Sequence, residues 1–169
     1  MVEIIINDDI LQKAAQEGMD EFVQTFVDAI YNAIGGELNA EALAKLNADQ
    51  ITLLAYQIMH EEVMDGGFVQ LIHNGYGPFI FRNPFDKAIK GWGIMELYKL
   101  IGKCHKLYSK YGPEIEQECT DEEFMAMFEK FSEFDDYDDE FVENEEQWTD
   151  EVAHYIDEHI EQFATIVKE

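Results

Sequence analysis

The chain has 169 residues, 47% of them hydrophobic, so a folded domain with a conventional core is expected and a disordered acidic tail is excluded. Its 37 acidic and 11 basic side chains leave a formal net charge of −26, which repels nucleic acid and anionic lipid and attracts cationic partners. Two cysteines make no disulfide framework, and no stretch approaches the ~20 apolar residues of a membrane helix, so we expect a cytoplasmic protein with free thiols that binds neither membrane nor DNA.

Apolar residues at helical spacing predict an all-α fold for residues 1–169, a single-domain compact bundle of roughly seven to nine helices, several of them short. The first helix is expected to begin at a cap on Asp8 or Asp9, to run past Gly18 and to end at residues 35–36. Asn39 opens a short helix that ends near residue 46. The sequence shows no convincing strand pattern outside residues 2–6.

The helix that follows Asn47 carries apolar groups on nearly every side, so we expect it to be central and largely buried. Its narrow polar stripe is expected to consist of Gln50, Gln57 and Glu61. Two glycines then interrupt it, and Gly66 and Gly67 can each hold a positive φ or let two backbones approach closely. A short helix over residues 68–72 follows this joint.

Residues 74–84 are rich in Gly, Pro and Asn and predict a loop. Two helices are expected over residues 85–111, divided near residues 91–93, and Gly112-Pro113 is expected to stop the second. Thr120 and Glu123 form a capping box before an aromatic helix. A short acidic helix at residues 138–146 and a last helix from about Trp148 complete the prediction.

Charge is distributed unevenly along the chain. Residues 1–81 hold 13 acids and 2 bases, residues 82–110 hold 2 acids and 7 bases, and residues 111–169 hold 22 acids and 2 bases. The basic residues of the middle segment, which could lie against acidic helices of their own chain or of a second copy, are Arg82, Lys87, Lys90, Lys99, Lys103, Lys106 and Lys110. An electrostatic function is therefore expected in the strongly acidic C-terminal third, 111–169.

The densest acidic cluster supplies the candidate partner-binding surface. Carboxylates at i, i+3 and i+4 on a helix lie roughly 5–6 Å apart, which resembles the charge separation along a nucleic-acid backbone. Such a surface can occupy a basic DNA-binding cleft, whereas the alternative is a face that is only solvated. The candidate residues are Asp135, Asp136, Asp138, Asp139, Glu140, Glu143, Glu145 and Glu146.

Metal and nucleophile motifs are incomplete. The run that begins at His60 resembles a helical zinc-protease motif, but Met64 stands where the second histidine is needed. A calcium loop counted from Asp136 has Phe141 where glycine is required. Cys104 is adjacent to a histidine in sequence and is not paired with it across a helical turn, so no nucleophile pair is supported. We expect no metal and no cofactor.

The segment from Glu62 to Gly75 resembles the Asn-Gly-Gly-Phe-x-Gln…Asn-x-x-Gly signature of a bacterial family typified by a nineteen-kilodalton DNA-mimic protein. The matching residues, which we interpret as architectural, are Gly66, Gly67, Phe68, Gln70 and Asn74. Asp65 departs from the asparagine that is usual before the glycines. The resemblance implies an all-helical fold, binding to a transcriptional regulator in place of DNA, and a homodimer as one arrangement open to the chain.

The first hypothesis is therefore a non-enzymatic acidic protein, a DNA mimic that binds the DNA-binding surface of a basic regulator or nucleoid protein. Two alternatives remain open. One is an immunity-type protein that neutralises a single cationic toxin. The other is an enzyme with a pocket near Glu61, Glu62 and His73, which a deep polar cavity at the joint would favour and a filled joint would oppose.

Overall fold

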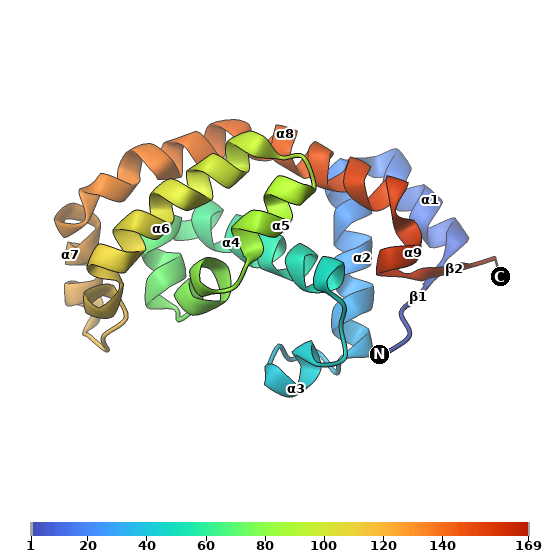
Figure 1. The fold of residues 1–169 in the computed structure, drawn as a ribbon, viewed down its shortest axis with the longest axis horizontal. Helices are drawn as coiled ribbons and strands as arrows, with labels where there is room; N and C mark the ends of the chain where they lie inside the picture. Colours follow the sequence, from blue (N-terminus) through green and yellow to red (C-terminus); the bar gives the residue numbers. More distant parts are fainter. Residues whose placement is uncertain (1, 169) are drawn as a thin grey trace. The chain divides into compact units, whose positions relative to one another are not determined.

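The computed structural model describes residues 2–168, which form nine α-helices, one π-helical turn, one 3-10 turn and two three-residue strands (Figure 1). The all-α prediction is confirmed. Within residues 2–168, none of the helices combines the length and the apolar character that crossing a bilayer requires. The chain divides into two compact units, residues 1–54 with 146–169 and residues 55–145. The single-domain prediction stays a prediction.

The first unit contains both strands and the helices near the two termini. Its elements are β1 (Ile5–Asn7), α1 (Asp8–Glu17), α2 (Met19–Ala33), α3 (Ala40–Leu43), the first turns of α4 (Ala48–His73), the last turns of α8 (Asp135–Glu158), α9 (Ile160–Phe163) and β2 (Thr165–Val167). The strands pair in parallel, with Ile6 opposite Ile166. β1 overlaps the segment in which the sequence allowed a strand, whereas three-residue β2 is too short to show a period.

The predicted continuous first helix is wrong, because Gly18 separates α1 from α2. Its φ of 151° lies outside the helical region, and a Cβ there would stand 2.7 Å from the Asp20 carboxylate. The cap is also one residue earlier than predicted. Asn7 Oδ1 accepts hydrogen bonds from the backbone N–H groups of Asp9 and Ile10 at 2.9 and 3.3 Å. Asp8 and Asp9 instead lie in the first turn, where negative charge complements the helix dipole.

Aromatic side chains fill the core of the first unit. Phe26 of α2 meets Phe163 of α9 edge to face, with 6.3 Å between ring centroids, and Trp148 of α8 is fully buried. Gln50 is buried too, contrary to the predicted polar stripe. Its Oε1 accepts from Asn47 N–H at 3.0 Å and its Nε2 donates to the Phe163 carbonyl at 3.1 Å, so burial leaves its amide satisfied.

The second unit contains the remaining helices. They are the later turns of α4, the π-helical turn η1 (Pro78–Arg82), α5 (Phe85–Gly91), α6 (Met95–Ile115), α7 (Asp121–Lys130), the 3-10 turn η2 (Ser132–Phe134) and the first turns of α8. The predicted division of residues 85–111 into two helices is confirmed, as is the capping box of Thr120 and Glu123. The predicted loop at residues 74–84 is wrong where η1 forms within it.

Two helices run farther than the sequence analysis expected. α6 continues through Gly112-Pro113 to Ile115, because Pro113 lies in its last turn and removes only one intrahelical hydrogen bond. α8 is one 24-residue helix and not an acidic helix followed by a second one. No glycine or proline interrupts it, and Thr149, which was expected near a helix start, is a buried residue in its interior.

The core of the second unit is centred on Phe68, which follows the interruption in α4. Its ring centroid lies 6.5 Å from Phe134 and 6.3 Å from Phe141, and all three side chains are fully buried. Fixing Phe68 therefore fixes the direction of the second half of α4 against η2 and the start of α8.

Candidate partner-binding surface and the kink in α4

The interruption in α4 is a kink made by one of the two glycines. Gly67 has φ 78° and ψ −176°, whereas Gly66 keeps a negative φ. A Cβ on Gly67 would stand 2.4 Å from Asp138 Oδ2, and a Cβ on Gly66 would stand 2.0 Å from Gln70 Oε1. Gly66 is needed because the Gln70 side chain lies against it. Gly67 is needed both for its positive φ and because the Asp138 carboxylate lies against it.

Asp138 of α8 caps the helical segment that begins after the kink. Its Oδ1 accepts a hydrogen bond from the backbone N–H of Phe68 at 2.8 Å. Burial raises the pKa of Asp138 to about 7, the hydrogen bond from Phe68 opposes that rise, and the charges of Asp135 and Asp139 add to it. This carboxylate is therefore an internal support of the kink and not a solvated surface charge.

The polar residues of the signature form a clasp across the kink. Glu62, before the kink, accepts hydrogen bonds from Gln70 Nε2 at 2.8 Å and from Asn74 Nδ2 at 2.9 Å. Asp65 accepts a second hydrogen bond from Gln70 Nε2 at 2.9 Å. The asparagine that is usual at this position of the signature could accept the same bond through its side-chain carbonyl oxygen. Gln70 and Asn74 thus hold two helical segments together, in agreement with their architectural interpretation.

Five of the eight candidate carboxylates are exposed along α8, and we call them the acidic stripe: Asp135, Asp136, Asp139, Glu143 and Glu146. From Asp136 they follow one another at intervals of 3, 4 and 3 residues, so consecutive charges lie roughly 5–6 Å apart on one helical face. Within residues 2–168 no lysine, arginine or histidine forms an ion pair with them. The stripe is open to a cationic partner.

The other three candidates are half-buried. Asp138 lies at the kink, and Glu145 Oε2 is 2.7 Å from His60 Nε2, beside the rings of Tyr56 and Phe141. Glu140 is only partly exposed. The helical spacing of the exposed acids continues at Asp150. This residue lies beyond the predicted end of the acidic helix at residue 146 and was not among the candidates.

The three residues of the enzyme alternative make separate contacts. Glu61 accepts from Gln57 of its own helix at 3.0 Å, and Glu62 is engaged in the clasp. His73 Nδ1 lies 2.8 Å from the Ile115 carbonyl, and its ring packs on Phe124 at 4.6 Å between centroids. Each of these three side chains thus makes its own contact within the protein.

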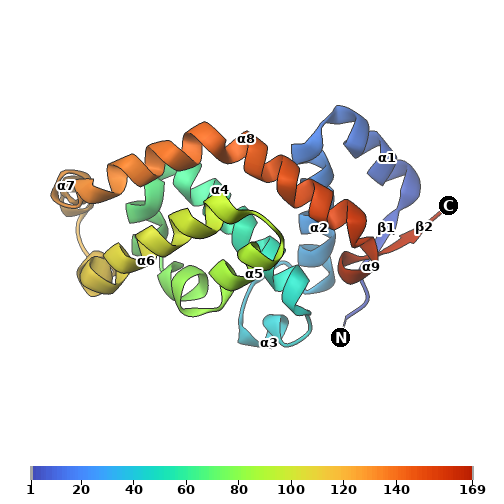
Figure 2. The same cartoon turned by 45° about the horizontal axis from the view of Figure 1, so that its top comes forward.

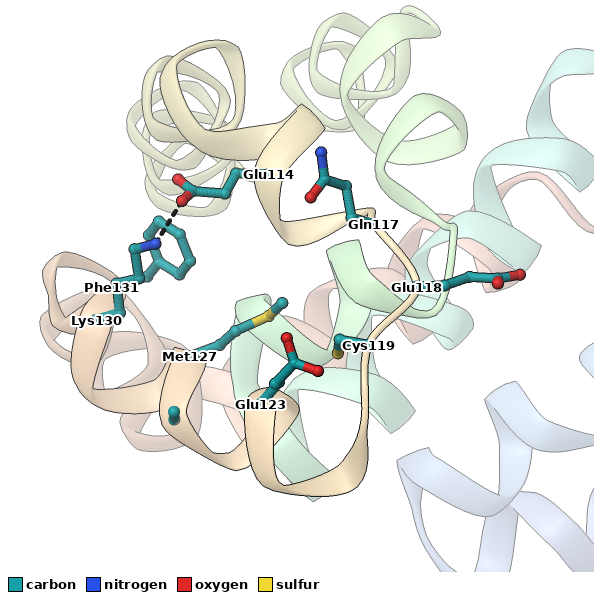
Figure 3. Close-up of a pocket in the computed structure, with 9 residues that line it drawn as sticks. Glu114, Gln117, Glu118, Cys119, Glu123, Met127, Lys130 and Phe131 are labelled. Atoms are coloured by element: carbon teal, nitrogen blue, oxygen red, sulfur yellow. Dashed lines mark hydrogen bonds and ion pairs between the residues drawn. The ribbon is translucent and has the colours of Figure 1, made fainter.

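A pocket of about 280 Å³ does occur elsewhere in the second unit, between the end of α6 and α7 (Figure 3). An ion pair between Lys130 and Glu114 closes one side, and Met127, Cys119 and Glu123 line the other. Burial, together with the nearby charges of Glu123 and Asp121, raises the pKa of the Cys119 thiol. A raised pKa lowers the fraction of Cys119 present as thiolate, which is the nucleophilic form, at neutral pH.

Histidine, cysteine and carboxylate side chains of residues 2–168 nowhere form a cluster of three able to hold a metal ion. Both cysteines, Cys104 and Cys119, are free. The site with the clearest physical character is therefore the acidic stripe on α8, held in place by the kink beneath it.

The family model of the DMP19-like proteins matches residues 44–159. The chain is also similar to the DNA mimic protein DMP19 of Neisseria meningitidis serogroup B (strain MC58), with 32% identity over 167 residues that cover 98% of each chain. The chain belongs to the DMP19-like family.

The segment matched to the DMP19-like family includes the kink, the clasp and all of α8. The family resemblance inferred from the glycine-glycine-phenylalanine signature is thereby confirmed. In this DMP19-like chain the signature residues build the joint, while the exposed carboxylates form the surface. What the sequence analysis missed was Glu62 as the acceptor of the clasp and Asp138 as the cap of the kink, because both contacts depend on the fold.

Proposed function

We propose that this protein is a DNA mimic: a non-enzymatic cytoplasmic protein whose acidic stripe occupies the DNA-binding surface of a basic regulator or nucleoid protein. The stripe presents fixed carboxylates at roughly 5–6 Å intervals, and a DNA strand presents one charge per ~3.4 Å of helix axis. A basic cleft that has evolved to neutralise phosphates can therefore pair with several of these carboxylates at once.

The observation that carries this proposal is that the acidic stripe is exposed and forms no ion pair with any basic residue among residues 2–168, in a chain that contains 11 lysines and arginines. Like charges at i, i+4 on a helix are mutually destabilising by roughly 0.2–0.5 kcal/mol per pair. If the stripe served only solubility, lysines placed between its carboxylates could remove this repulsion. The name of the relative, a DNA mimic, supports the same conclusion for this chain.

The test is affinity capture from a lysate of the source organism at low salt and again at several-fold higher salt, with identification of the retained proteins by mass spectrometry. We expect a basic DNA-binding protein that salt releases, because screening weakens electrostatic association. The purified partner should release its own labelled duplex when this protein is added.

Two variants make the test specific. Asp135→Asn, Asp136→Asn, Asp139→Asn and Glu143→Gln together should abolish capture, since these carboxylates are exposed. The hydrogen bond from Phe68 N–H to Asp138 at the kink involves none of them. The control removes the same charge from exposed acids elsewhere, with Glu3→Gln, Glu17→Gln, Glu37→Gln and Glu41→Gln. An equal loss of capture in both variants would show that capture depends on the net charge of the protein and not on the acidic stripe. Capture of a cationic toxin in place of a regulator would favour the immunity-type alternative.

A further inference from the structure

A second charged surface of opposite sign lies on α6. Lys99, Lys103, Lys106 and Lys110 follow one another at intervals of 4, 3 and 4 residues, and all four are exposed. They therefore point to one face of the helix. We call them the lysine stripe. Neighbouring α5, which packs against α6, adds exposed Lys87 and Lys90.

The lysine stripe does not neutralise the acidic stripe. Lys99 pairs with Glu96 of its own helix at 3.3 Å, and Lys110 lies over the Tyr111 ring. Among the ion pairs of residues 2–168, none joins a lysine of α6 to a carboxylate of α8. Adjacent lysines repel one another, so α6 concentrates positive charge at a cost to helix stability.

The second unit contains α6, with the lysine stripe, and the first turns of α8, with all of the acidic stripe except Glu146. Cys104 of α6 is buried close enough to α8 that the charges of Asp138 and Glu140, after burial itself, raise its pKa. Tyr111 of α6 donates a hydrogen bond of 2.5 Å to Glu133, two residues before α8 begins. Figures 1 and 2 both show α6 running alongside the first half of α8.

This arrangement decides which anion the lysine stripe can bind. An extended polyanion such as DNA, or a planar anionic membrane, is repelled by the acidic stripe on the neighbouring helix and by the net charge of −26. A folded protein can instead carry a limited acidic patch next to a basic one. Gly102 lies among the lysines, and a Cβ at this position would have nothing within 4 Å, which leaves space for the backbone of such a partner.

We infer that the lysine stripe of α6 is a second contact surface, which binds an acidic patch on the same target protein whose DNA-binding surface receives the acidic stripe. The inference rests on the proposed function and deepens it. DNA has no positive charges, so contacts to the lysine stripe are available to this protein and not to the DNA it replaces. Lysines also repel basic proteins that lack the acidic patch, and specificity follows from that repulsion.

The test compares two charge-matched triple variants of the full chain. Lys103→Gln, Lys106→Gln and Lys110→Gln remove the three lysines of the stripe other than Lys99, which is paired with Glu96. Lys13→Gln, Lys45→Gln and Lys168→Gln remove the same charge from exposed positions elsewhere. Binding is measured to decalysine, a purely cationic probe, and to the proteins captured from lysate by the unaltered chain. Circular dichroism establishes that each variant is folded.

We expect the stripe variant to lose about tenfold in affinity for the captured partner, since exposed ion pairs are individually weak, and to bind decalysine at least as tightly as before. The control should keep its affinity for the partner. If the lysine-stripe variant binds the partner as tightly as the unaltered chain does, the inference is overturned. The proposed function is tested separately by the variant of Asp135, Asp136, Asp139 and Glu143. Lysine-dependent binding of a short duplex DNA would also overturn it, and capture of no partner by the unaltered chain would overturn both.

Discussion

Asp138 is the residue whose protonation is most closely tied to the fold. Its pKa is raised from the ordinary 3.8 to about 7, so between these values the folded protein holds the proton more tightly than the unfolded chain. Its contribution to the free energy of unfolding is therefore fully present below about pH 4 and is lost as pH rises through 7.

Asp138→Asn should remove this dependence, because an amide can still accept the bond from Phe68 and does not titrate. We expect the difference in free energy of unfolding between variant and unaltered chain, measured with urea at several pH values, to move in favour of the variant from pH 5 to pH 8. A difference that is constant over this range would contradict the linkage.

Gly67 is the residue at which the backbone itself is most constrained. Gly67→Ala should destabilise the protein by roughly 2 kcal/mol or more, because alanine disfavours φ near 78° and its Cβ would meet the Asp138 carboxylate. Gly102→Ala is the control. It lies inside α6 with open space around it, and the same change should stabilise by about 0.5–1 kcal/mol. Urea unfolding measures both, and equal effects would contradict the assignment.

At the scale of elements, α8 combines the proposed partner-binding surface with repulsion between like charges. Asp139 and Glu143 are four residues apart in its interior, whereas Asp135 and Asp136 lie in its first turn, where the helix dipole favours them.

Asp139→Asn with Glu143→Gln should therefore raise the free energy of unfolding by about 0.5–1 kcal/mol. Asp135→Asn should leave it unchanged or lower it. Thermal unfolding at low salt resolves the two cases, and a destabilised double variant would show that the interior carboxylates have intramolecular partners in solution.

The elements also show which parts of the fold could be predicted from the sequence. Periodicity identified most helices, and the capping box at Thr120 located the start of α7. The predicted helix boundaries were wrong where tertiary contacts determine the ends of the helices. Gly18 breaks a pattern whose apolar period continues unchanged, and the period gave no reason to expect that α8 would pass through Thr149 without a break.

The residues of the candidate site likewise differ in whether local spacing or tertiary contacts determine their positions. Asp139 and Glu143 are exposed, as a partner-binding surface requires. The inward positions of Asp138 and Glu145 depend on Phe68 and His60, which lie about 70 to 85 residues away in sequence. The signature glycines were correctly interpreted as architectural. Their partner Asp138 could not be identified, because nothing in the spacing of the acids distinguishes it from its exposed neighbours.

At the scale of the whole molecule, the charge of −26 should give salt opposite effects on folding and on binding. Raising ionic strength from about 0.01 M to about 1 M shortens the Debye length from about 30 Å to about 3 Å. Self-repulsion is screened, so the free energy of unfolding should rise, while affinity for a cationic partner should fall. Urea titrations and decalysine binding in the same buffers measure the two, and a parallel change in both would contradict this prediction.

The protein's two tryptophans lie one in each compact unit. Trp148 is fully buried in the first unit, whereas Trp92 caps the C-terminal end of α5 and is only half-buried. Since α5 packs against α6, Trp92 lies next to the helix that carries the lysine stripe. Trp148→Phe would leave Trp92 as the sole tryptophan emitter. Its fluorescence would then respond to a partner that docks on α6, so the protein carries a label-free optical reporter beside its own lysine stripe.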